Sequence, residues 1–468
     1  MHRTHHITRL PLTRWTPCTL NHHRIAANAV KQSVRCASSL PKPVSELTHA
    51  DSQVSAETRA KVQRYNEFTV TTYARPDIVL TRGKGCYVYD SEGREYLDFT
   101  AGIAVAALGH ADPEVAKVLF EQGSKLIHSS NLFHNENAGA LAEKIVTTTR
   151  EHGGTWASKI FLSNSGTEAN EGALKFARKW GKHVTGSEST TKTKIVSFTN
   201  GFHGRSMGAL SATYNPKYQK PFAPLVPGFV TVPFNDVEKT IEAITEDTCG
   251  VIVEPLQGEG GVHEATAEFL HALRKRCDET GAVLIFDEIQ CGLGRTGKLW
   301  GHGHFAGCAP DILTMAKPLA NGVPIGAVMT NDKVADMIKL GDHGTTFGGN
   351  PLAAAVALNV FGRISDESFL KSVQEKGDAL KSDLEALQSR YPNVIKEVRG
   401  KGLLLGVELH RDPSPIVKMA RERGLLLVTA GSNTVRIIPP LTISKEEARQ
   451  GIARLAGAVE EFSKLSSA

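Results

Sequence analysis

The sequence lacks several features that would assign it to a specialised class of protein. Its 468 residues contain no apolar run that approaches the roughly 20 residues of a membrane-spanning helix. No internal repeat or long low-complexity segment is present. With 41% hydrophobic and 22% charged residues, the composition is that of an ordinary globular protein, and the length allows two domains with substantial cores.

Acidic residues are absent from the N-terminal end. Seven Lys and Arg precede the first acid, Glu46, and the remainder has 47 basic against 49 acidic residues, a net charge of −2. The formal charge of +5 therefore gives no indication of nucleic-acid binding. A basic, acid-free segment without the roughly 7–15-residue apolar core of a secretory signal predicts a mitochondrial transit peptide and a matrix location. We place that peptide at residues 1–36, although a disordered cytosolic tail has a similar composition.

Cysteine is sparse and shows no pairing pattern. Of the seven cysteines, Cys18 and Cys36 fall within the predicted transit peptide, and the other five form no CxxC pair. This usage suits a reducing compartment.

Apolar runs of strand length alternate with helical patterns through the middle of the chain. Such alternation predicts an α/β fold with a mostly parallel sheet covered by helices on both faces. After Asn350 the pattern changes to long helices followed by short strands, which predicts a smaller α+β domain. The strands expected in the larger domain are Lys159–Ser163, Ile195–Phe198, Gly250–Glu254, Val283–Asp287, Ile312–Met315 and Ile325–Met329.

These patterns also predict the order of domains. We expect a large domain over residues 106–345 and a small domain over 346–468. Before them, we expect a poorly ordered segment over 37–57 and an N-terminal segment over 58–105 that packs with the small domain. Within that segment, Ile78–Leu80 and Cys86–Tyr89 flank a glycine-containing stretch at 82–85, which predicts a hairpin with its turn there.

An acid and a lysine follow two of the predicted strands. The apolar run 282–286 ends in Asp287, and the run 311–315 leads into Lys317. A buried carboxylate is costly without a positive partner, and ligands of open α/β sheets bind at this side of the sheet. Pyridoxal phosphate needs a lysine that attaches it and an acid that pairs with its protonated pyridine nitrogen. Taken alone, such an Asp is more often a cap and such a Lys is usually solvated.

The stretch from Ser163 to Glu171 follows another strand and opens a helix. Its spacing is that of a capping box, and the amides of Gly166 and Thr167 are accessible, so the helix start suits a phosphate. A simple helix cap explains the bare pattern equally well. Farther along, Phe202 is suited to stack on a planar ring and Arg205 to hold a carboxylate, although a core position and a surface position explain them as well.

Several of these motifs together resemble the class-III (ω-amino-acid) aminotransferases of fold type I. The segments that carry the resemblance are Asp287-Glu-Ile-Gln290, Gly294-Arg-Thr-Gly297 and Ala316-Lys317, and it extends from about residue 68 to 464. The resemblance implies that Lys317 and Asp287 are catalytic. It implies that pyridoxal 5'-phosphate is bound by Gly166, Thr167, Phe202, Asp287, Gln290, Lys317 and Thr346.

The resemblance also implies how substrates bind. Arg205 is expected to contact the substrate, and Glu259 to pair reversibly with Arg436, so that one pocket serves an ω-amino donor and then glutamate or its keto acid. The glycine-rich loop 343–351 is expected to cross a homodimer interface. Thr346 would then reach the phosphate of the partner subunit, and Thr345 would lie near the substrate. From sequence alone, an ordinary glycine-rich loop is an alternative.

Within the family, residues 97–105 and 128–133 most resemble members that use N2-acetyl-L-ornithine as donor and 2-oxoglutarate as acceptor. Ornithine-using members have a tyrosine where this chain has Ile103, and an apolar residue suits an N-acylated amine because it carries no charge. Ala106 and the tripeptide 111–113 depart from the family pattern. Ornithine, 4-aminobutyrate or succinyl-diaminopimelate as donor, and a non-catalytic cofactor-binding protein, are the alternatives.

Two further patterns are expected to be incidental. The glycines of 292–297 match GxGxxG, but no acid stands about 20 residues on at a strand end, as dinucleotide binding requires. His302 and His304 lack a third ligand at zinc-like spacing, so no metal site is expected.

Overall fold

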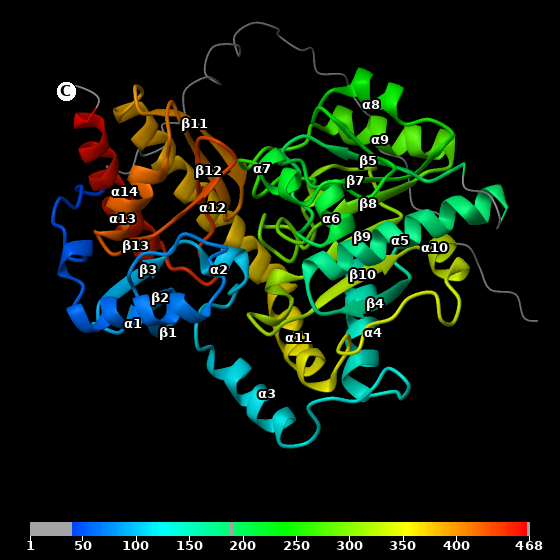
Figure 1. Ribbon diagram of the computed structural model, residues 1–468, viewed down its shortest axis with the longest axis horizontal. Helices are drawn as coiled ribbons and strands as arrows, with labels where there is room; N and C mark the ends of the chain where they lie inside the picture. The colour runs from blue at the N-terminus through cyan, green and yellow to red at the C-terminus, as the bar shows by residue number, and fades with distance from the viewer. Residues whose placement is uncertain (1–39, 187–190, 466–468) are drawn as a thin grey trace, which may run out of the picture. The chain divides into compact units, whose positions relative to one another are not determined.

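A seven-stranded mixed sheet forms the centre of the described chain (Figure 1). In the computed structural model, which describes residues 40–186 and 191–465, the strand order is β4-β10-β9-β8-β7-β5-β6. β10 is antiparallel to both neighbours, and the pairs from β9 to β6 are parallel, so the predicted α/β fold is confirmed. The strands are β4 (Lys159–Ser163), β5 (Lys194–Phe198), β6 (Phe229–Val232), β7 (Thr248–Val253), β8 (Val283–Asp287), β9 (Ile312–Met315) and β10 (Gly326–Thr330).

Helices cover both faces of this sheet because its strands present apolar side chains on each side. In β8, Ile285 packs in one cluster with Phe176 of α5, whereas Phe286 packs in another with Phe269 of α9. Successive strand residues point to opposite faces, so the two clusters lie on opposite sides. The helices of this region are α4 (Glu136–Glu151), α5 (Gly166–Thr185), α6 (Met207–Ala212), α7 (Pro216–Gln219), α8 (Val237–Ala243), α9 (Ala267–Thr280) and α10 (Asp332–Met337), with short 3-10 helices η2 (Lys220–Phe222), η3 (Gly301–His304) and η4 (Lys317–Ala320).

There are two smaller sheets, and the first combines strands from the two ends of the chain. In the first, β1, β2 and β3 are antiparallel and β13 adds in parallel beside β3. The second has the order β11-β12-β15-β14 and is antiparallel throughout. The strands are β1 (Leu80–Lys84), β2 (Tyr87–Asp90), β3 (Glu95–Asp98), β11 (Ile395–Lys401), β12 (Leu404–Leu409), β13 (Leu425–Leu426), β14 (Val428–Ala430) and β15 (Thr434–Ile437).

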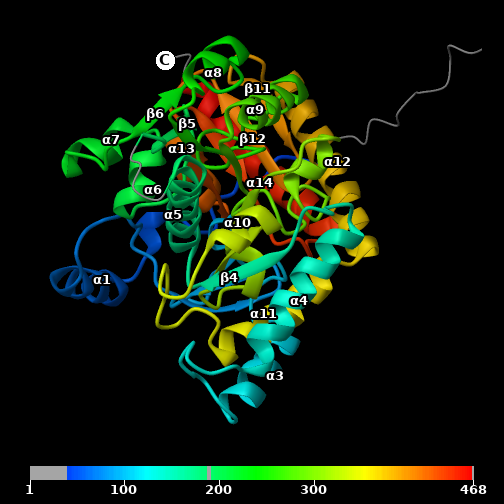
Figure 2. The ribbon, with the colours of Figure 1, turned by 90° about the vertical axis from the view of Figure 1, so that its right-hand side faces the viewer.

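Some of the remaining helices pack on other helices, and some pack on the smaller sheets. α11 packs against α3 and α4 (Figure 2), and α12 packs against β11. Figure 1 shows the N-terminal strands, in blue, beside α13 and α14 in orange and red. These elements are η1 (Asp51–Gln53), α1 (Ala56–Phe68), α2 (Ala101–Ala104), α3 (Pro113–Gly123), α11 (Pro351–Ile364), α12 (Glu367–Arg390), α13 (Ser414–Arg421) and α14 (Lys445–Lys464).

The start of the described chain is bound to the C-terminal helices, although residues 37–57 were expected to be poorly ordered. Val44 N donates to Ala453 O at 3.0 Å, and Arg423 Nε donates to Val44 O at 2.9 Å. The approach depends on Gly457, where a Cβ would lie 1.9 Å from Val44 O. The predicted transit peptide and residues 37–39 lie outside the described residues.

The predicted hairpin has its turn in the wrong place. Arg82, Gly83 and Lys84 belong to β1 and pair with β2, so the chain reverses at Gly85 and Cys86. β1 is largely exposed, so polar side chains are compatible with it, and Gly83 lets His110 pack against it, since a Cβ would lie 2.5 Å from His110 Cβ. β6 was not expected, although Phe229-Val-Thr-Val232 has the β-branched and aromatic character of a strand.

The described residues from Leu40 onward form one compact unit. Because α11 packs on α3 and α4, contacts continue across the boundary expected at residues 345 and 346, and the division into a large and a small domain stays a prediction. Within the described residues, no helix is both long and apolar enough to cross a bilayer.

Candidate active site

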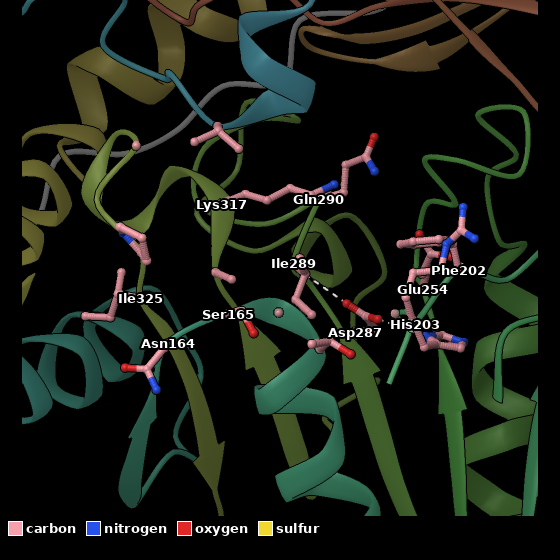
Figure 3. A pocket seen from close by; sticks show the side chains of 18 of the residues that line it. Asn164, Ser165, Phe202, His203, Glu254, Asp287, Ile289, Gln290, Lys317 and Ile325 are labelled. Carbon is pink, nitrogen blue, oxygen red and sulfur yellow. Dashed lines mark hydrogen bonds and ion pairs between the residues drawn. The ribbon is translucent and has the colours of Figure 1, made fainter. Parts of the chain in front are cut away.

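A cavity of about 400 Å³ lies at the carboxyl ends of β8 and β9, against the first turn of α5 (Figure 3). This is the side of an open α/β sheet at which ligands bind. Figure 3 shows Lys317 extended across the cavity, with Asp287 and His203 turned toward one another. Among the predicted site residues, the cavity is lined by Gly166, Thr167, Phe202, Arg205, Asp287, Gln290 and Lys317.

Asp287 is held rigidly at the end of β8. Its side chain is almost completely buried and accepts hydrogen bonds from His203 Nδ1 at 2.8 Å, Asn170 Nδ2 at 2.8 Å and Ile289 N at 3.0 Å. Thr314 donates to Asn170 Oδ1 at 2.8 Å and so fixes the orientation of that amide. A carboxylate oriented by three donors is well suited to face a protonated ring nitrogen.

Two members of this network were not assigned from the sequence. Neither His203 nor Asn170, which lies within the helix-opening motif, is among the predicted site residues. The available signal was the helical spacing that places Asn170 one turn after Gly166, on a buried position of α5. Their partner Asp287 lies 117 and 84 residues farther along the chain, so the contact itself follows only from the fold.

Lys317 lies at the start of η4, directly after β9 and Ala316. Burial lowers the pKa of Lys317 to about 8, and the nearby Arg436 guanidinium acts in the same direction. No described residue accepts a hydrogen bond from its amine. Its φ of +36° lies in the left-handed region, a strained backbone of the kind that clusters at functional sites. A lysine with a lowered pKa has the neutral amine that a nucleophile or a proton carrier requires.

The first turn of α5 provides unpaired backbone donors. Ser165 Oγ accepts from Glu168 N at 3.2 Å, but the Glu168 carboxylate accepts from Asn164 N, so the expected capping box is only half formed. No described residue accepts from Gly166 N or Thr167 N, and these amides add to the positive end of the helix dipole. A Cβ at Gly166 would lie 2.9 Å from Ile289 Cγ2, so only glycine fits there.

These features fit pyridoxal phosphate. The free amides at the start of α5 suit its phosphate, Asp287 suits its ring nitrogen, and the amine of Lys317 lies in the same cavity. The fit rests on polar groups that the protein leaves without partners, which is how a preformed anion site differs from an ordinary helix cap.

Phe202 and Glu254 fix the wall beside Asp287. Glu254 is buried at the end of β7 and accepts from Phe202 N at 2.9 Å and from Gly258 N at 3.1 Å. Burial, reinforced by the nearby Asp287 carboxylate, raises the pKa of Glu254. The acid thus anchors two loops.

Arg205 lines the cavity from an exposed position. Its guanidinium stacks on the ring of Tyr218, with Cζ 3.2 Å from the ring centre, and lies 5.9 Å from the ring of Phe202. No acid among the described residues pairs with it, so its N–H groups are available to a carboxylate. Tyr218 was not singled out from the sequence, because a tyrosine in a short helix gives no such signal.

Glu259 and Arg436 come together as predicted from the sequence. Arg436 Nη2 donates to Glu259 Oε2 at 2.7 Å, and Arg436 Nη1 donates to Gln290 Oε1 at 2.7 Å. The Arg436 side chain is 2% exposed and the Glu259 side chain 32% exposed. Because Gly431 N holds Glu259 O at 2.7 Å, the carboxylate can leave Arg436 by side-chain rotation alone.

Five predicted residues do not line the cavity: the paired Glu259 and Arg436, and also Thr345, Thr346 and Ile103. Thr345 accepts a hydrogen bond from Asn164 Nδ2 at 2.9 Å and so lies beside the start of α5, whereas Thr346 is exposed. Ile103 is partly buried against the cluster that includes Leu256, and the cavity is lined instead by Val105, two residues on. Their predicted contacts with substrate or phosphate stay predictions.

His302 and His304 have structural partners. His302 Nδ1 donates to the buried Glu288 carboxylate at 2.7 Å, and His304 Nε2 lies 3.2 Å from Thr296 O. The glycines of the GxGxxG match shape a turn, since Gly294 and Gly297 have φ values of +85° and +83°.

The strand order, the lysine–aspartate site and the anion-binding helix start define a pyridoxal-phosphate enzyme of fold type I. The aminotransferase class-III family model matches residues 70–459, and the chain belongs to that family. It is 54% identical over 404 residues to the mitochondrial acetylornithine aminotransferase of Yarrowia lipolytica, covering 86% of this chain and 96% of that protein. It is 49% identical to the protein of the same name from Saccharomyces cerevisiae, covering 87% and 98% of the two chains.

Solved structures agree with this assignment. The N-acetylornithine aminotransferase of Stenotrophomonas maltophilia is 37% identical with a TM-score of 0.72, covering 84% of this chain and 99% of that one. An ornithine aminotransferase from Toxoplasma gondii is 34% identical with a TM-score of 0.81, covering 88% and 96% of the two chains, and holds pyridoxal phosphate at its active site with partial occupancy. This chain is accordingly a pyridoxal-phosphate-dependent aminotransferase.

Proposed function

We propose that the chain transfers the 5-amino group of N2-acetyl-L-ornithine to 2-oxoglutarate, giving N-acetyl-L-glutamate 5-semialdehyde and L-glutamate, a reaction of arginine biosynthesis. The observation that carries the proposal is the Glu259–Arg436 pair beside Lys317. A donor that reacts at its ω-amine presents no carboxylate next to the reacting carbon, whereas 2-oxoglutarate does. The names of the most similar relatives support the choice of donor.

Lys317 and Asp287 carry out the chemistry in this proposal. Pyridoxal phosphate, when bound, supplies an electron sink for the negative charge that develops on the donor's C5 carbon. Asp287 keeps that sink effective by holding a proton on the ring nitrogen. Lys317 Nζ takes the proton that leaves C5, and its lowered pKa keeps a useful fraction of the amine neutral near physiological pH.

The two arginines separate the two substrates. Arg205 has free N–H groups and holds the α-carboxylate of the acetylated donor. While the donor is bound, Glu259 covers Arg436, so no unpaired cation faces the donor's carbon chain. When 2-oxoglutarate enters, its carboxylate replaces Glu259 on Arg436.

A panel of amino donors tests the substrate assignment. Purified protein with 2-oxoglutarate should show its highest kcat/KM with N2-acetyl-L-ornithine among that donor, ornithine, 4-aminobutyrate and succinyl-diaminopimelate. The Lys317→Ala variant is the control for enzyme-catalysed turnover and should be inactive. Equal or better use of ornithine would overturn the choice of donor while leaving the aminotransferase assignment intact.

We also infer a homodimer in which Thr346 reaches the phosphate in the partner subunit. Its support is a surface of exposed apolar side chains around the loop that carries Thr346. Asn131 Nδ2 donates to Thr345 O and to Gly348 O, which joins that loop to residues 126–133. The exposed apolar residues on these segments are Leu126, Ile127, Leu132, Phe133 and Phe347. A second copy of the chain is the partner that would cover them.

Co-expression of two inactive variants distinguishes action in the partner from action in the same chain. Lys317→Ala and Thr346→Asp should each be inactive alone. In a mixed dimer, one site then combines an intact Lys317 with an intact Thr346 only if Thr346 acts across the interface. Recovered activity supports the proposal, and its absence in isolated mixed dimers would place Thr346 in its own subunit.

We propose a mitochondrial matrix location, with residues 1–36 as the transit peptide. The basic, acid-free composition and the mitochondrial names of the similar relatives support it. A reporter fused to residues 1–39 should enter the matrix. The same fusion with residues Arg3, Arg9 and Arg14 replaced by Glu should not. A wild-type fusion that stays in the cytosol would refute the proposal.

A further inference from the structure

One turn of left-handed helix stands between β3 and the cavity. Ala101, Gly102, Ile103 and Ala104 have φ values of +46°, +62°, +67° and +62°. Ala104 N donates to Thr100 O at 2.9 Å and Val105 N to Ala101 O at 2.8 Å, so the segment is hydrogen-bonded as a helical turn. Three of the four residues carry a Cβ, which the left-handed conformation crowds, and Ile103 is β-branched as well. The surrounding structure must therefore impose this backbone.

The buried carboxylate of Asp98 imposes it from one end. Asp98 is 2% exposed at the end of β3. Its Oδ1 accepts from Thr100 N at 2.8 Å, Thr100 Oγ1 at 2.6 Å and Ala101 N at 3.1 Å. These three donors are the groups at which the chain enters the left-handed turn, so the carboxylate fixes its first residue.

His110 holds the other oxygen of that carboxylate. Its Nε2 donates to Asp98 Oδ2 at 2.8 Å. The backbone of His110 is itself locked in a bridge with Gly85, with N···O distances of 2.7 and 2.9 Å in the two directions. Asp98 therefore has no freedom to rotate away from the turn.

The far end of the turn is tied to the loop of the catalytic lysine. Asn321, the residue after η4, accepts from Leu108 N at 2.8 Å and donates to Gly109 O at 3.0 Å. The segment that follows the turn is therefore fixed relative to Lys317, four residues before Asn321.

The turn determines where two apolar side chains stand. Val105 lines the cavity, and Ile103 packs with Leu256 and Ile438 in an apolar cluster whose members do not line it. If residues 101–104 relaxed to right-handed backbone, both side chains would point elsewhere. The position of the apolar wall at Val105 thus depends on the Asp98 carboxylate.

We propose that Asp98, held by His110, is a positioning residue for donor selection: it keeps the left-handed turn in place, so that Val105 forms the wall against which the donor's N-acyl end rests. The inference rests on the proposed function for the identity of the donor. Asp98 itself does not line the cavity, so it acts through the turn.

Three variants test it on the purified, cofactor-loaded enzyme. Asp98→Ala should raise KM for N2-acetyl-L-ornithine about tenfold and lower the preference over ornithine, while KM for 2-oxoglutarate changes less than about twofold. Asp98→Asn keeps an oxygen acceptor for the three donors and an N–H for His110, and should behave almost as wild type. Adding Ala101→Gly to Asp98→Ala should recover most of the loss, because glycine accepts positive φ without crowding.

Asp112→Ala is the matched control. Asp112 also accepts two backbone N–H groups, Glu114 N and Val115 N, and pairs with Arg363, but lies at the start of α3 away from the cavity. It should lower Tm without changing the ratio of the two KM values. Equal KM changes for both substrates in Asp98→Ala, or no recovery in the double variant, would overturn the inference; if Asp98→Ala does not fold, the same ratios are measured in His110→Gln.

The donor panel separates this inference from the proposed function. If wild type prefers another donor, the proposed function fails, and the Asp98 variants are measured with that donor instead. A selective loss for that donor, recovered by Ala101→Gly, still supports the positioning role, and an unselective loss refutes it.

Discussion

Replacing Arg436 with alanine should separate the two half-reactions of the enzyme. In the proposed function, the variant loses the guanidinium that would receive the 2-oxoglutarate carboxylate, whereas the donor half-reaction requires that guanidinium only while Glu259 covers it. Removing one partner of a buried charge pair costs about 2–5 kcal/mol. At about 1.4 kcal/mol per decade, kcat/KM for 2-oxoglutarate should fall roughly 30- to 5,000-fold, and kcat/KM for the donor less than about tenfold.

The exposed fractions of the Arg436 and Glu259 side chains explain why the two half-reactions should be affected unequally. Arg436 is 2% exposed and also donates to Gln290, whereas Glu259 is 32% exposed and can be hydrated once Arg436 is gone. The variant should therefore fold, with little destabilisation from the remaining acid. Each half-reaction is followed separately by the change in cofactor absorbance after mixing with one substrate.

A reciprocal variant sharpens this test. Glu259→Gln removes the negative charge that covers Arg436, so the donor half-reaction should weaken and the 2-oxoglutarate half-reaction should not. Arg363→Ala is the control, since it breaks the 2.8 Å pair with Asp112 outside the cavity and should leave both unchanged. Equal losses in both half-reactions of Arg436→Ala would show that Arg436 is structural and refute the reasoning.

The remaining predictions concern Lys317, Asp287 and the thiols. Because the pKa of Lys317 is lowered to about 8, its amine is protonated below that pH and neutral above it. The rate of cofactor uptake by the cofactor-free protein should therefore increase as the pH rises, with a midpoint near pH 8. A midpoint near the ordinary 10.5 would contradict this. Asp287→Asn should still bind the cofactor but lose roughly 10²–10³-fold in kcat, the usual cost of one preorganised electrostatic group; wild-type kcat would exclude its role. Burial raises the pKa of all five described thiols, so a native chain starting at Leu40 should resist alkylation at about pH 8 and take up label only when unfolded; rapid native labelling would contradict the burial of Cys86, Cys249, Cys277, Cys291 and Cys308.

Most of the central sheet could be predicted because β5, β7, β8, β9 and β10 are almost wholly buried. A strand of this kind is a continuous apolar run, and β8 and β9 have the predicted bounds, as does the less buried β4. The full length of β1 was not predicted because its residues are mostly exposed and its polar segment Arg82-Gly-Lys84 has the composition of a turn. What makes it a strand is pairing with β2, which local sequence does not encode.

The site residues likewise fall into those that local sequence predicts and those whose contacts depend on the fold. Lys317, Asp287 and Gly166 could be predicted because each follows a strand or opens a helix, so their placement depends on local pattern. Asn170 and His203 required knowledge of which strand ends meet. Glu259 and Arg436 are 177 residues apart, and their pairing was predicted only from the resemblance to a family. In the structure, Arg436 Nη2 lies 2.7 Å from Glu259 Oε2.

Backbone strain at the site explains why its support is spread along the chain. Lys317 and the turn at 101–104 both have positive φ without glycine at most positions, and neither conformation is favoured by its own sequence. Each is instead fixed by polar groups from elsewhere: the turn by Asp98 and His110, and its link to the lysine loop by Asn321. Because Asn321, which follows η4, bonds to Leu108 and Gly109, the segment after the turn is fixed relative to the lysine loop. In the proposed function, in which the site accepts two differently charged substrates, the apolar wall stays fixed and the partly exposed Glu259 carboxylate is the group that adjusts.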